Sequence, residues 1–207
     1  MRVVKNLLIK RLRDGILALG LLTQAGCLIS EEPFFQKEDR VFDERLLGDF
    51  KIENYSQPLS ITHWESEKDS YRVVVPSDSK YATDCVMIFH GVLFRVGTNR
   101  FLDLIPARQP CDRVSGTVSP LEILQGLTQQ PLHLLVRVDI QNDKVNMAYL
   151  DTAALQAAMK KSPELFKKVS GRMIADSKQQ REFLLRFGND TNTFNTRYEF
   201  QKIPPKQ

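Results

Sequence analysis

Cysteine, tryptophan and histidine are scarce in this 207-residue chain, which contains three, one and three of them respectively. No Cys-x-x-Cys spacing occurs, which argues against a redox motif or a zinc ribbon. The chain also lacks a Gly-x-Ser-x-Gly turn and a Gly-rich phosphate loop, the signatures of many hydrolases and nucleotide-binding proteins. No apolar run reaches the roughly 20 residues that a membrane-spanning helix needs. The sequence therefore contains no motif that defines a molecular activity.

The first 26 residues combine a basic start with a short apolar run. They hold five basic residues and one acidic residue (Arg2, Lys5, Lys10, Arg11, Arg13 and Asp14). Residues 15–25 are mostly apolar, and the segment closes on small residues. A positive start, an apolar stretch of roughly 7–15 residues and a small-residue end are typical of a secretory signal peptide.

The ending Ala25-Gly26-Cys27 resembles the lipobox of bacterial lipoproteins, in which the cysteine receives lipid and becomes the first mature residue. Gln24 stands where that family usually has Leu or another apolar residue. The resemblance implies that residues 1–26 are a signal peptide and that Cys27 carries two or three acyl chains, such as palmitate, which anchor the protein to a membrane. Leu28 rather than Asp follows Cys27, so the family rule implies the outer membrane, facing the periplasm, if the host has two membranes.

Two other interpretations of the leader stay open. Thr23 and Ala25 also form a small-x-small pattern, and cleavage after Ala25 would release a soluble exported protein that begins at Gly26. A retained membrane anchor is disfavoured because residues 15–25 are too few to span a bilayer.

The positive net charge comes from the leader alone. It contains five of the 29 basic and one of the 25 acidic residues, so 24 of each remain after Gly26. A neutral mature chain gives no argument for a nucleic-acid partner. The roughly 180 remaining residues are enough for one domain with a sizeable core.

Cys85 and Cys111 remain as a pair if Cys27 is lipidated. In an oxidising envelope we expect them to form a disulfide at the base of a hairpin, which constrains the unfolded chain by roughly 3–4 kcal/mol. Two separate buried thiols are the alternative.

Residues 27–45 are expected to be the lipidated N-terminus and a polar, acidic tether, and residues 46–207 a single β-rich domain. Phe34-Phe35 interrupts the tether, and we expect it to dock back on the domain.

Strand signals dominate the domain. Alternating or continuous apolar runs predict strands around Phe50, at residues 61–64, 71–75, 86–96, 101–105, 132–140, 145–150 and 193–203. Gly97-Thr98-Asn99 and Asn142-Asp143 are expected to link hairpins. The aromatic residues of these strands (Phe50, Phe89, Phe94, Phe101, Tyr198 and Phe200) are expected in the core.

Helices are few, and most lie in the second half of the chain. Capping residues, proline and glycine predict helices that start at Ser119, at Asp151 or Thr152, at Ser162-Pro163 and at Ser177. The second has Leu155 and Met159 on one face, the third ends at Gly171, and the fourth buries Phe183, Leu184 and Phe187 before Gly188.

The segment Leu47-Gly48-Asp49-Phe50 is similar to the Gly-x-Trp start of lipocalin-like barrels, with Phe in place of Trp. The arrangement as a whole also resembles uncharacterised bacterial lipoproteins that join a small β-rich domain to a lipid anchor. Together with the hairpins, this predicts an α+β fold: an antiparallel, β-rich, barrel-like or strongly curved sheet with three or four short helices, mainly in the C-terminal half.

Candidate chemistry is sparse, and no catalytic, cofactor or metal site is predicted. His63, His90 and His133 could form an open zinc site only if they converge, and scattered strand histidines more often satisfy local hydrogen bonds. His63 and Glu65 share a strand face at period two, which suits either an acid–base pair or a solvated edge.

Asp103 and Arg95 are expected to form a structural ion pair across a hairpin. Lys160-Lys161 and Lys167-Lys168 form a basic helix side, which is either solvated or touches lipid head groups.

The role we expect is non-catalytic binding. A small apolar ligand held inside the barrel is the first hypothesis, and a structural or assembly subunit that engages another envelope protein is the alternative. An enzyme of unknown type is third. No cofactor and no nucleic acid are expected; the membrane is a partner through the lipid on Cys27.

Overall fold

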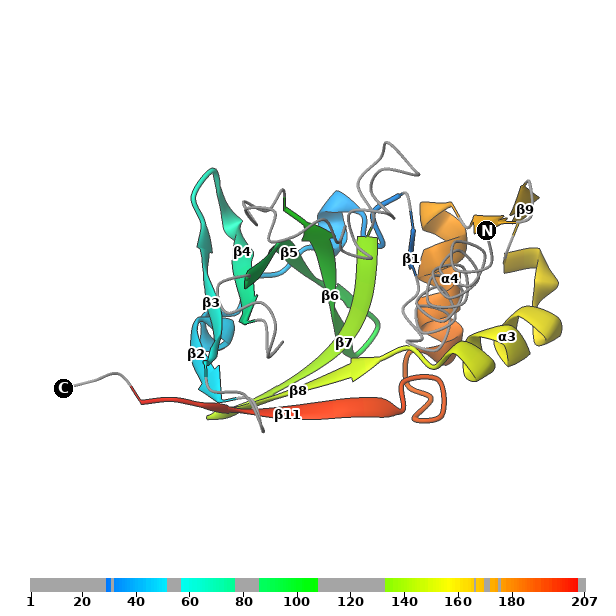
Figure 1. Ribbon diagram of the computed structural model, residues 1–207. Coiled ribbons are helices and arrows are strands. Elements are labelled where there is room, and N and C mark those ends of the chain that lie inside the picture. Colours follow the sequence, from blue (N-terminus) through cyan, green and yellow to red (C-terminus); the bar gives the residue numbers. More distant parts are fainter. Residues whose placement is uncertain are drawn as a thin grey trace, which may run out of the picture.

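Eight antiparallel strands close into a barrel in this computed structural model, which describes residues 29–30, 32–51, 57–76, 86–107, 133–165, 167–169, 172–174 and 176–204 (Figure 1). The barrel strands are β2 (Gly48–Lys51), β3 (Leu59–Trp64), β4 (Glu67–Pro76), β5 (Val86–Val96), β6 (Asn99–Pro106), β7 (His133–Gln141), β8 (Lys144–Tyr149) and β11 (Thr196–Lys202). From β2 to β8 each strand pairs with the next one along the chain; β11 then pairs with both β8 and β2, and β8 pairs back to β7. The predicted barrel-like antiparallel sheet is confirmed.

The hairpins follow the predicted turns, with one difference in length. Val96 pairs with Asn99, so the β5–β6 link is two residues, Gly97-Thr98, rather than the three expected. Gly97 has a φ of +62°, which glycine adopts without the cost that a side chain adds. Asn142-Asp143 links β7 to β8 as predicted, with Gln141 opposite Lys144.

Apolar side chains fill the barrel interior. The buried cluster inside the barrel, each member of which is no more than 7% exposed, includes Phe50, Leu59, Ile61, Tyr71, Val73, Phe89, Leu93, Leu102, Leu104, Val136, Val138, Ile140, Val145, Met147 and Phe200. Gly91 faces the same interior, and a Cβ there would lie 3.3–3.4 Å from Leu104, Leu102 and Val73. A methyl group added in this layer would fit only if the neighbouring side chains shifted by a few tenths of an ångström.

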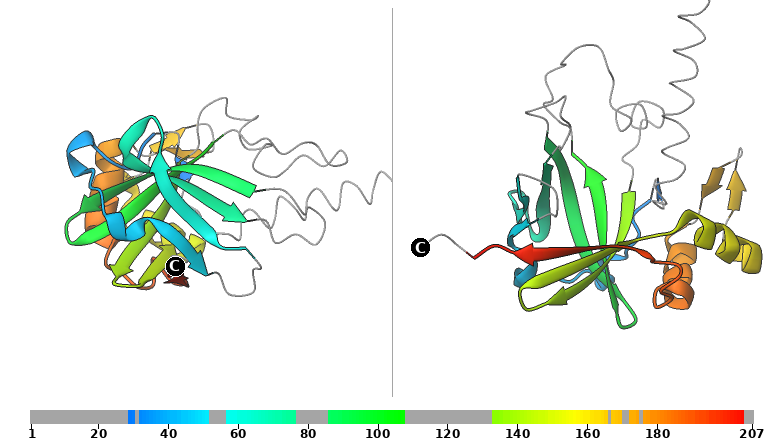
Figure 2. Two further views of the ribbon diagram at one scale, coloured as in Figure 1. Left: turned by 90° about the vertical axis from the view of Figure 1, so that its left-hand side faces the viewer. Right: turned by 60° about the horizontal axis from the view of Figure 1, so that its bottom comes forward.

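A second apolar cluster lies between the outside of the barrel and the helices. It contains Phe34, Phe94, Val96, Phe101, Leu135, Ala148, Leu150, Ala158, Leu165, Phe183, Leu184 and Phe194. The two α-helices of the described chain, α3 (Thr152–Lys161) and α4 (Ser177–Phe187), lie together on one side of the barrel (Figures 1 and 2). Neither helix covers the opposite side of the barrel, toward which the C-terminus extends (Figure 1).

The helix predictions are confirmed in part. α3 begins after Asp151, whose carboxylate accepts a hydrogen bond from the Ala154 amide. α4 spans the predicted residues, but its N-cap is Asp176 and not Ser177. The helix expected at Ser119 lies outside the described residues.

The helix predicted from Ser162-Pro163 to Gly171 is wrong. Only a 3-10 turn, η3 (Pro163–Leu165), follows the proline, and then β9 (Lys167–Val169) pairs with β10 (Arg172–Ile174) as a separate two-stranded sheet. One short apolar stripe does not stabilise a helix by itself, and the β-branched residues Val169 and Ile174 suit strands.

Tyr198 is the exception among the aromatic residues assigned to the core. It is 51% exposed, whereas Phe50, Phe94 and Phe101 are 0% exposed. Tyr198 stacks edge-on against Tyr149 with ring centroids 5.7 Å apart, toward the start of β11.

The segment expected as a tether lies against the barrel over most of its described length. β1 (Ile29–Ser30) pairs with β7, and residues 32–42, which we call the N-terminal strap, include the short 3-10 helix η1 (Lys37–Asp39). Phe34 is 1% exposed, so the docking expected for Phe34 is confirmed. The Val41 amide donates to the Leu93 carbonyl at 2.9 Å, and Arg40 forms an isolated antiparallel β-bridge with Phe94. Both contacts lie on the part of β5 that follows Gly91, its last residue paired with β4.

Within the described residues no helix has both the length and the apolar character needed to cross a membrane.

Candidate functional site

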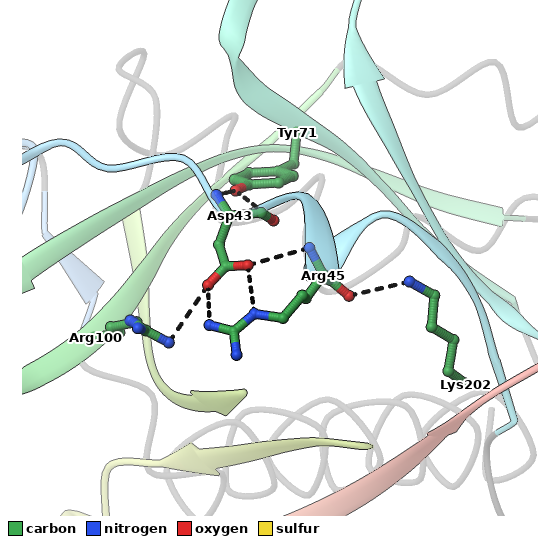
Figure 3. Close-up of polar contacts among 5 residues, drawn as sticks. All are labelled: Asp43, Arg45, Tyr71, Arg100 and Lys202. Carbon is green, nitrogen blue, oxygen red and sulfur yellow. Dashed lines mark hydrogen bonds and ion pairs between the residues drawn. The ribbon is translucent and has the colours of Figure 1, made fainter. Parts of the chain in front are cut away.

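One end of the barrel is covered by the 3-10 helix η2 (Glu44–Leu46), which precedes β2. Leu46 is fully buried and packs with the barrel interior. Polar contacts then connect η2 to three strands on different sides of the barrel: Tyr71 on β4, Arg100 on β6 and Lys202 on β11 (Figure 3). We call this region, formed by Asp43, Arg45, Tyr71, Arg100 and Lys202, the plugged end.

Asp43 is the hub of the plugged end. Its carboxylate accepts from the Arg45 amide at 3.1 Å, from Arg45 Nε at 2.9 Å and from Arg45 Nη2 at 2.6 Å. Arg100 Nη1 lies 3.4 Å from the same carboxylate (Figure 3). The hydrogen bond from the Arg45 side chain is the largest influence that lowers the pKa of Asp43, with Arg100 adding to it. A stable negative charge therefore lies among cations.

Tyr71 fixes the backbone of the plug. Its hydroxyl accepts from the Asp43 amide at 2.7 Å and donates to the Asp43 carbonyl at 3.3 Å. Phe42 stacks between Tyr71 and His63, with ring centroids 4.9 and 5.1 Å away. Burial raises the pKa of Tyr71 to about 12, so its hydroxyl stays protonated at neutral pH.

The cations of the plugged end are partly open to solvent. The Arg45 and Arg100 side chains are 46% and 36% exposed, whereas that of Asp43 is 15% exposed. Lys202 Nζ donates to the Arg45 carbonyl at 3.3 Å and lies 5.9 Å from the centre of the Phe50 ring. Arg95, an exposed residue of β5, lies directly opposite Arg100 in the sheet. Because opposite residues in an antiparallel pair share a face, both arginines leave the sheet on the inward side at this end.

A second polar site lies under the N-terminal strap. The carboxylate of Asp103, 0% exposed, receives His133 Nδ1 at 2.8 and 3.0 Å and the Phe34 amide at 3.3 Å. Burial raises the pKa of Asp103, and the bonds from His133 and Phe34 offset this only in part. Ser30 lies opposite His133 in the β1–β7 pair, and its hydroxyl accepts from Gln180 of α4 at 2.7 Å. Asp103 thus connects β6 to β7 and to the strap, and the Ser30–Gln180 hydrogen bond connects β1 to α4.

His90 belongs to a neighbouring ion-pair cluster. Its Nε2 lies 3.2 Å from Glu67, which also pairs with Arg40 of the strap at 2.5 Å. Burial lowers the pKa of His90. Burial is the largest single influence and acts to raise the pKa of Glu67, but the hydrogen bond and charge of Arg40 together with His90 and Ser70 outweigh it, so the pKa is lowered. Trp64 covers the imidazole at a centroid distance of 4.7 Å.

The expected pair of Asp103 with Arg95 is wrong. Asp103 lies opposite Val92, and Arg95 lies opposite Arg100. Asp103 therefore lies on the outward face of β6, whereas Arg95 lies on the inward face of β5. The partner of the carboxylate is instead His133 on β7.

The three histidines have different neighbours in the described chain. His63 stacks on Phe42, His90 pairs with Glu67, and His133 pairs with Asp103. No group of three or more metal-ligating side chains occurs among the described residues. β3 ends at Trp64 after a register shift, so the period-two relation between His63 and Glu65 does not hold.

The cysteines and the two lysine pairs singled out in the sequence do not belong to these polar sites. Cys27, Cys85 and Cys111 lie outside the described residues. Lys160 and Lys161 are exposed at the end of α3, and Lys167 and Lys168 lie in β9 rather than on a helix.

Sequence reasoning did not find the plugged end. Asp43 is 28 residues from Tyr71, 57 from Arg100 and 159 from Lys202, so no local pattern connects them. The one available signal is the Gly97-Thr98 turn: a two-residue link places Arg95 opposite Arg100.

The described strands thus define the class of fold, a closed eight-stranded antiparallel barrel with helices on one side. No family model matches the chain, and comparisons with the curated proteins and with the solved structures give no significant match.

Proposed function

We propose that this protein is a lipid-anchored component of the cell envelope with a non-catalytic role, in which the outside of the barrel engages another envelope protein. The observation that carries this choice is the filled barrel. The side chains of the buried cluster inside the barrel are at most 7% exposed, and a Cβ on Gly91 would already touch three neighbours. A small apolar ligand needs an internal volume of several hundred Å³, and the described interior offers little room for it.

The leader supports the anchor. Its basic start, apolar run and Ala25-Gly26-Cys27 ending resemble a lipoprotein signal. Cys27 is two residues before β1, a distance that an extended chain covers with about 7 Å. A lipid on Cys27 would therefore hold the barrel directly against the membrane surface, with β1 and the start of β7 nearest to it.

The anchor is tested by metabolic labelling with a fatty-acid probe. We expect the parent protein to carry the probe and to fractionate with membranes, and Cys27→Ala to lose both properties. The same unlabelled, aqueous behaviour for both proteins would show that Cys27 is not lipidated and would overturn the anchor.

The partner is tested by cross-linking in cells. A photo-reactive residue placed at exposed positions, for example Lys51 on the strand side and Lys178 on the helix side, should trap one dominant protein from one face and not from the other. Native mass spectrometry of the same preparation tests the competing hypothesis of an internal ligand. A co-purified apolar molecule, with only diffuse cross-links, would favour ligand carriage over the structural role.

A further inference from the structure

We infer that the plugged end, together with Arg95, binds a phosphate-type oxyanion of a dissolved ligand. Four cations gather there: Arg45 on the plug, Arg95 and Arg100 on β5 and β6, and Lys202 on β11. Arginine and lysine in this arrangement are the side chains that hold phosphate and carboxylate oxygens, because they offer several charge-assisted hydrogen bonds.

Arg95 lies directly opposite Arg100, an arrangement that does not stabilise the fold. Like charges directly opposite each other in an antiparallel pair destabilise the sheet. Both residues lie on the inward face at the barrel end, where they add to the charge of Arg45. Asp43, 3.4 Å from Arg100, offsets part of this repulsion, but Arg95 has no ion pair within the described residues. A bound anion beside Arg95 would remove the rest, and a local rule broken in this way is expected at functional positions.

The cations also have unused donors. Among the described residues Arg100 has one polar contact, at 3.4 Å to Asp43, although its guanidinium carries five N–H groups. Lys202 Nζ makes one hydrogen bond within the part of the chain that the structure describes, at 3.3 Å to the Arg45 carbonyl (Figure 3). Since the side chain of Arg100 is 36% exposed, a ligand in solution can reach it.

The contacts of Asp43 indicate that this end binds negatively charged oxygen atoms. Its carboxylate is already held by two arginines, and the Tyr71 hydroxyl and the buried Leu46 fix the plug that carries Arg45. Glu44 and Asp69 are exposed acidic residues near the same end and oppose an anion. The surplus of positive charge is therefore small, and because the cations are partly exposed, binding should weaken as the salt concentration rises.

The position of the plugged end favours a dissolved ligand over the head group of the protein's own membrane. β7 begins beside β1, near the proposed anchor, and ends at Gln141 beside the plugged end. At about 3.3 Å per residue, β7 separates the two ends by roughly 25 Å. This orientation, unlike the site itself, rests on the proposed lipid anchor.

Calorimetric titration of the purified protein with inorganic phosphate, at low and constant ionic strength, tests the site. We expect saturable binding that weakens roughly ten-fold in Arg100→Gln or Arg95→Gln, as for the loss of one charge-assisted hydrogen bond. Lys144→Gln is the matched control, because Lys144 is a cation on the outer face paired with Glu199. It should bind as the parent does.

Two further measurements separate the site from general effects of charge. Without ligand, Arg95→Gln should unfold at a slightly higher urea concentration than the parent, because it removes the repulsion, while its phosphate binding is weaker. Vesicles of phosphatidylglycerol serve as the lipid arm, and glycerol phosphate as the dissolved arm. Unchanged affinity in both arginine variants, or binding to vesicles alone, would overturn the proposal. Neither result depends on whether Cys27 is lipidated or a protein partner exists.

Discussion

Asp103 and His133 are the most tightly enclosed pair of titratable groups that the structure describes, at 0% and 4% side-chain exposure. The pair has a third donor, the Phe34 amide, which belongs to the N-terminal strap. While the buried carboxylate is hydrogen-bonded to both the His133 imidazole and the Phe34 amide, it stabilises the attachment of the strap. Without the imidazole, the same buried carboxylate destabilises the fold.

Replacing His133 should therefore be costly. We expect His133→Ala to lower the free energy of unfolding by about 3–5 kcal/mol, because it leaves a buried carboxylate without its main partner. Urea denaturation measures the change, and His63→Ala, at an exposed histidine, is the control. Similar small losses in both variants would show that the pair contributes little.

Asp43 should give the fold a dependence on acid. Its pKa is lowered in the folded protein, first of all by the Arg45 hydrogen bond. The resulting stabilisation is complete above the ordinary carboxyl pKa of about 4 and is lost as the pH falls through the lower folded value. We expect Asp43→Asn, which keeps the N-cap oxygen, to show a smaller loss of stability in acid than the parent.

Urea midpoints measured at neutral pH and at several pH values below about 4 test this difference. Glu44→Gln, on the same 3-10 turn, serves as the control and should follow the parent. An acid dependence that is unchanged in Asp43→Asn would contradict the assignment.

At the scale of elements, the N-terminal strap behaves as part of the barrel. It lies along β5 beyond the last β4 pair, and it covers Asp103. Arg181 of α4 binds Asp39 of η1 at 2.9 Å, so strap and helix support each other.

Truncating Phe34 tests this role of the strap. With 1% of its surface exposed, Phe34→Ala should lose about 3–5 kcal/mol of stability in urea denaturation, through lost burial and the cavity left behind. Leu185→Ala, at a residue that is 55% exposed on α4, should change stability little. Equal small effects would indicate that the strap detaches readily in solution.

The packing around Gly91 is tested by adding a side chain instead of removing one. Gly91→Val should cost about 1–3 kcal/mol, because the new methyl groups meet side chains already in contact distance. The nearest atom is Leu104 Cδ2 at 3.3 Å, so adding Leu104→Ala should recover part of the loss. Full tolerance of Gly91→Val in thermal or urea unfolding would reveal unfilled space and revive the hypothesis of an internal ligand.

At the scale of the whole molecule, the two ends of the barrel differ in their surroundings. One end lies beside β1 and the start of α4, which the Gln180–Ser30 hydrogen bond brings together at 2.7 Å. The other end is covered by η2 and carries the arginines. If Cys27 is lipidated, the first end is close to the bilayer and the second projects away from it.

This orientation is measurable by fluorescence quenching. A fluorophore on Lys178→Cys, in the first turn of α4, should be quenched by lipid-attached nitroxides in vesicles that carry the lipidated protein. The same label on Thr98→Cys, in the β5–β6 turn near the plugged end, should be quenched less. The reverse order would show that the barrel lies the other way round on the membrane.

The features that the sequence determined by itself are those with local causes. The runs from Val86 to Val96 and from His133 to Gln141 predict their strands because the pattern of apolar side chains is set within a few residues. Asp151 opens α3 for the same reason, since a cap acts on the next turn of the chain. The Pro163 helix failed because the same stripe fits a helix and a short hairpin, and only the surrounding structure chooses.

Only the tertiary structure decided which polar groups meet. A one-residue difference in the β5–β6 turn placed Arg95 opposite Arg100 and left Asp103 on the other face, because side chains alternate across a sheet. Closure of the barrel then brought Lys202 to Arg45, 157 residues away, and set His133 beside Asp103. Long-range contacts of this kind depend on register and closure, which no short stretch of sequence specifies.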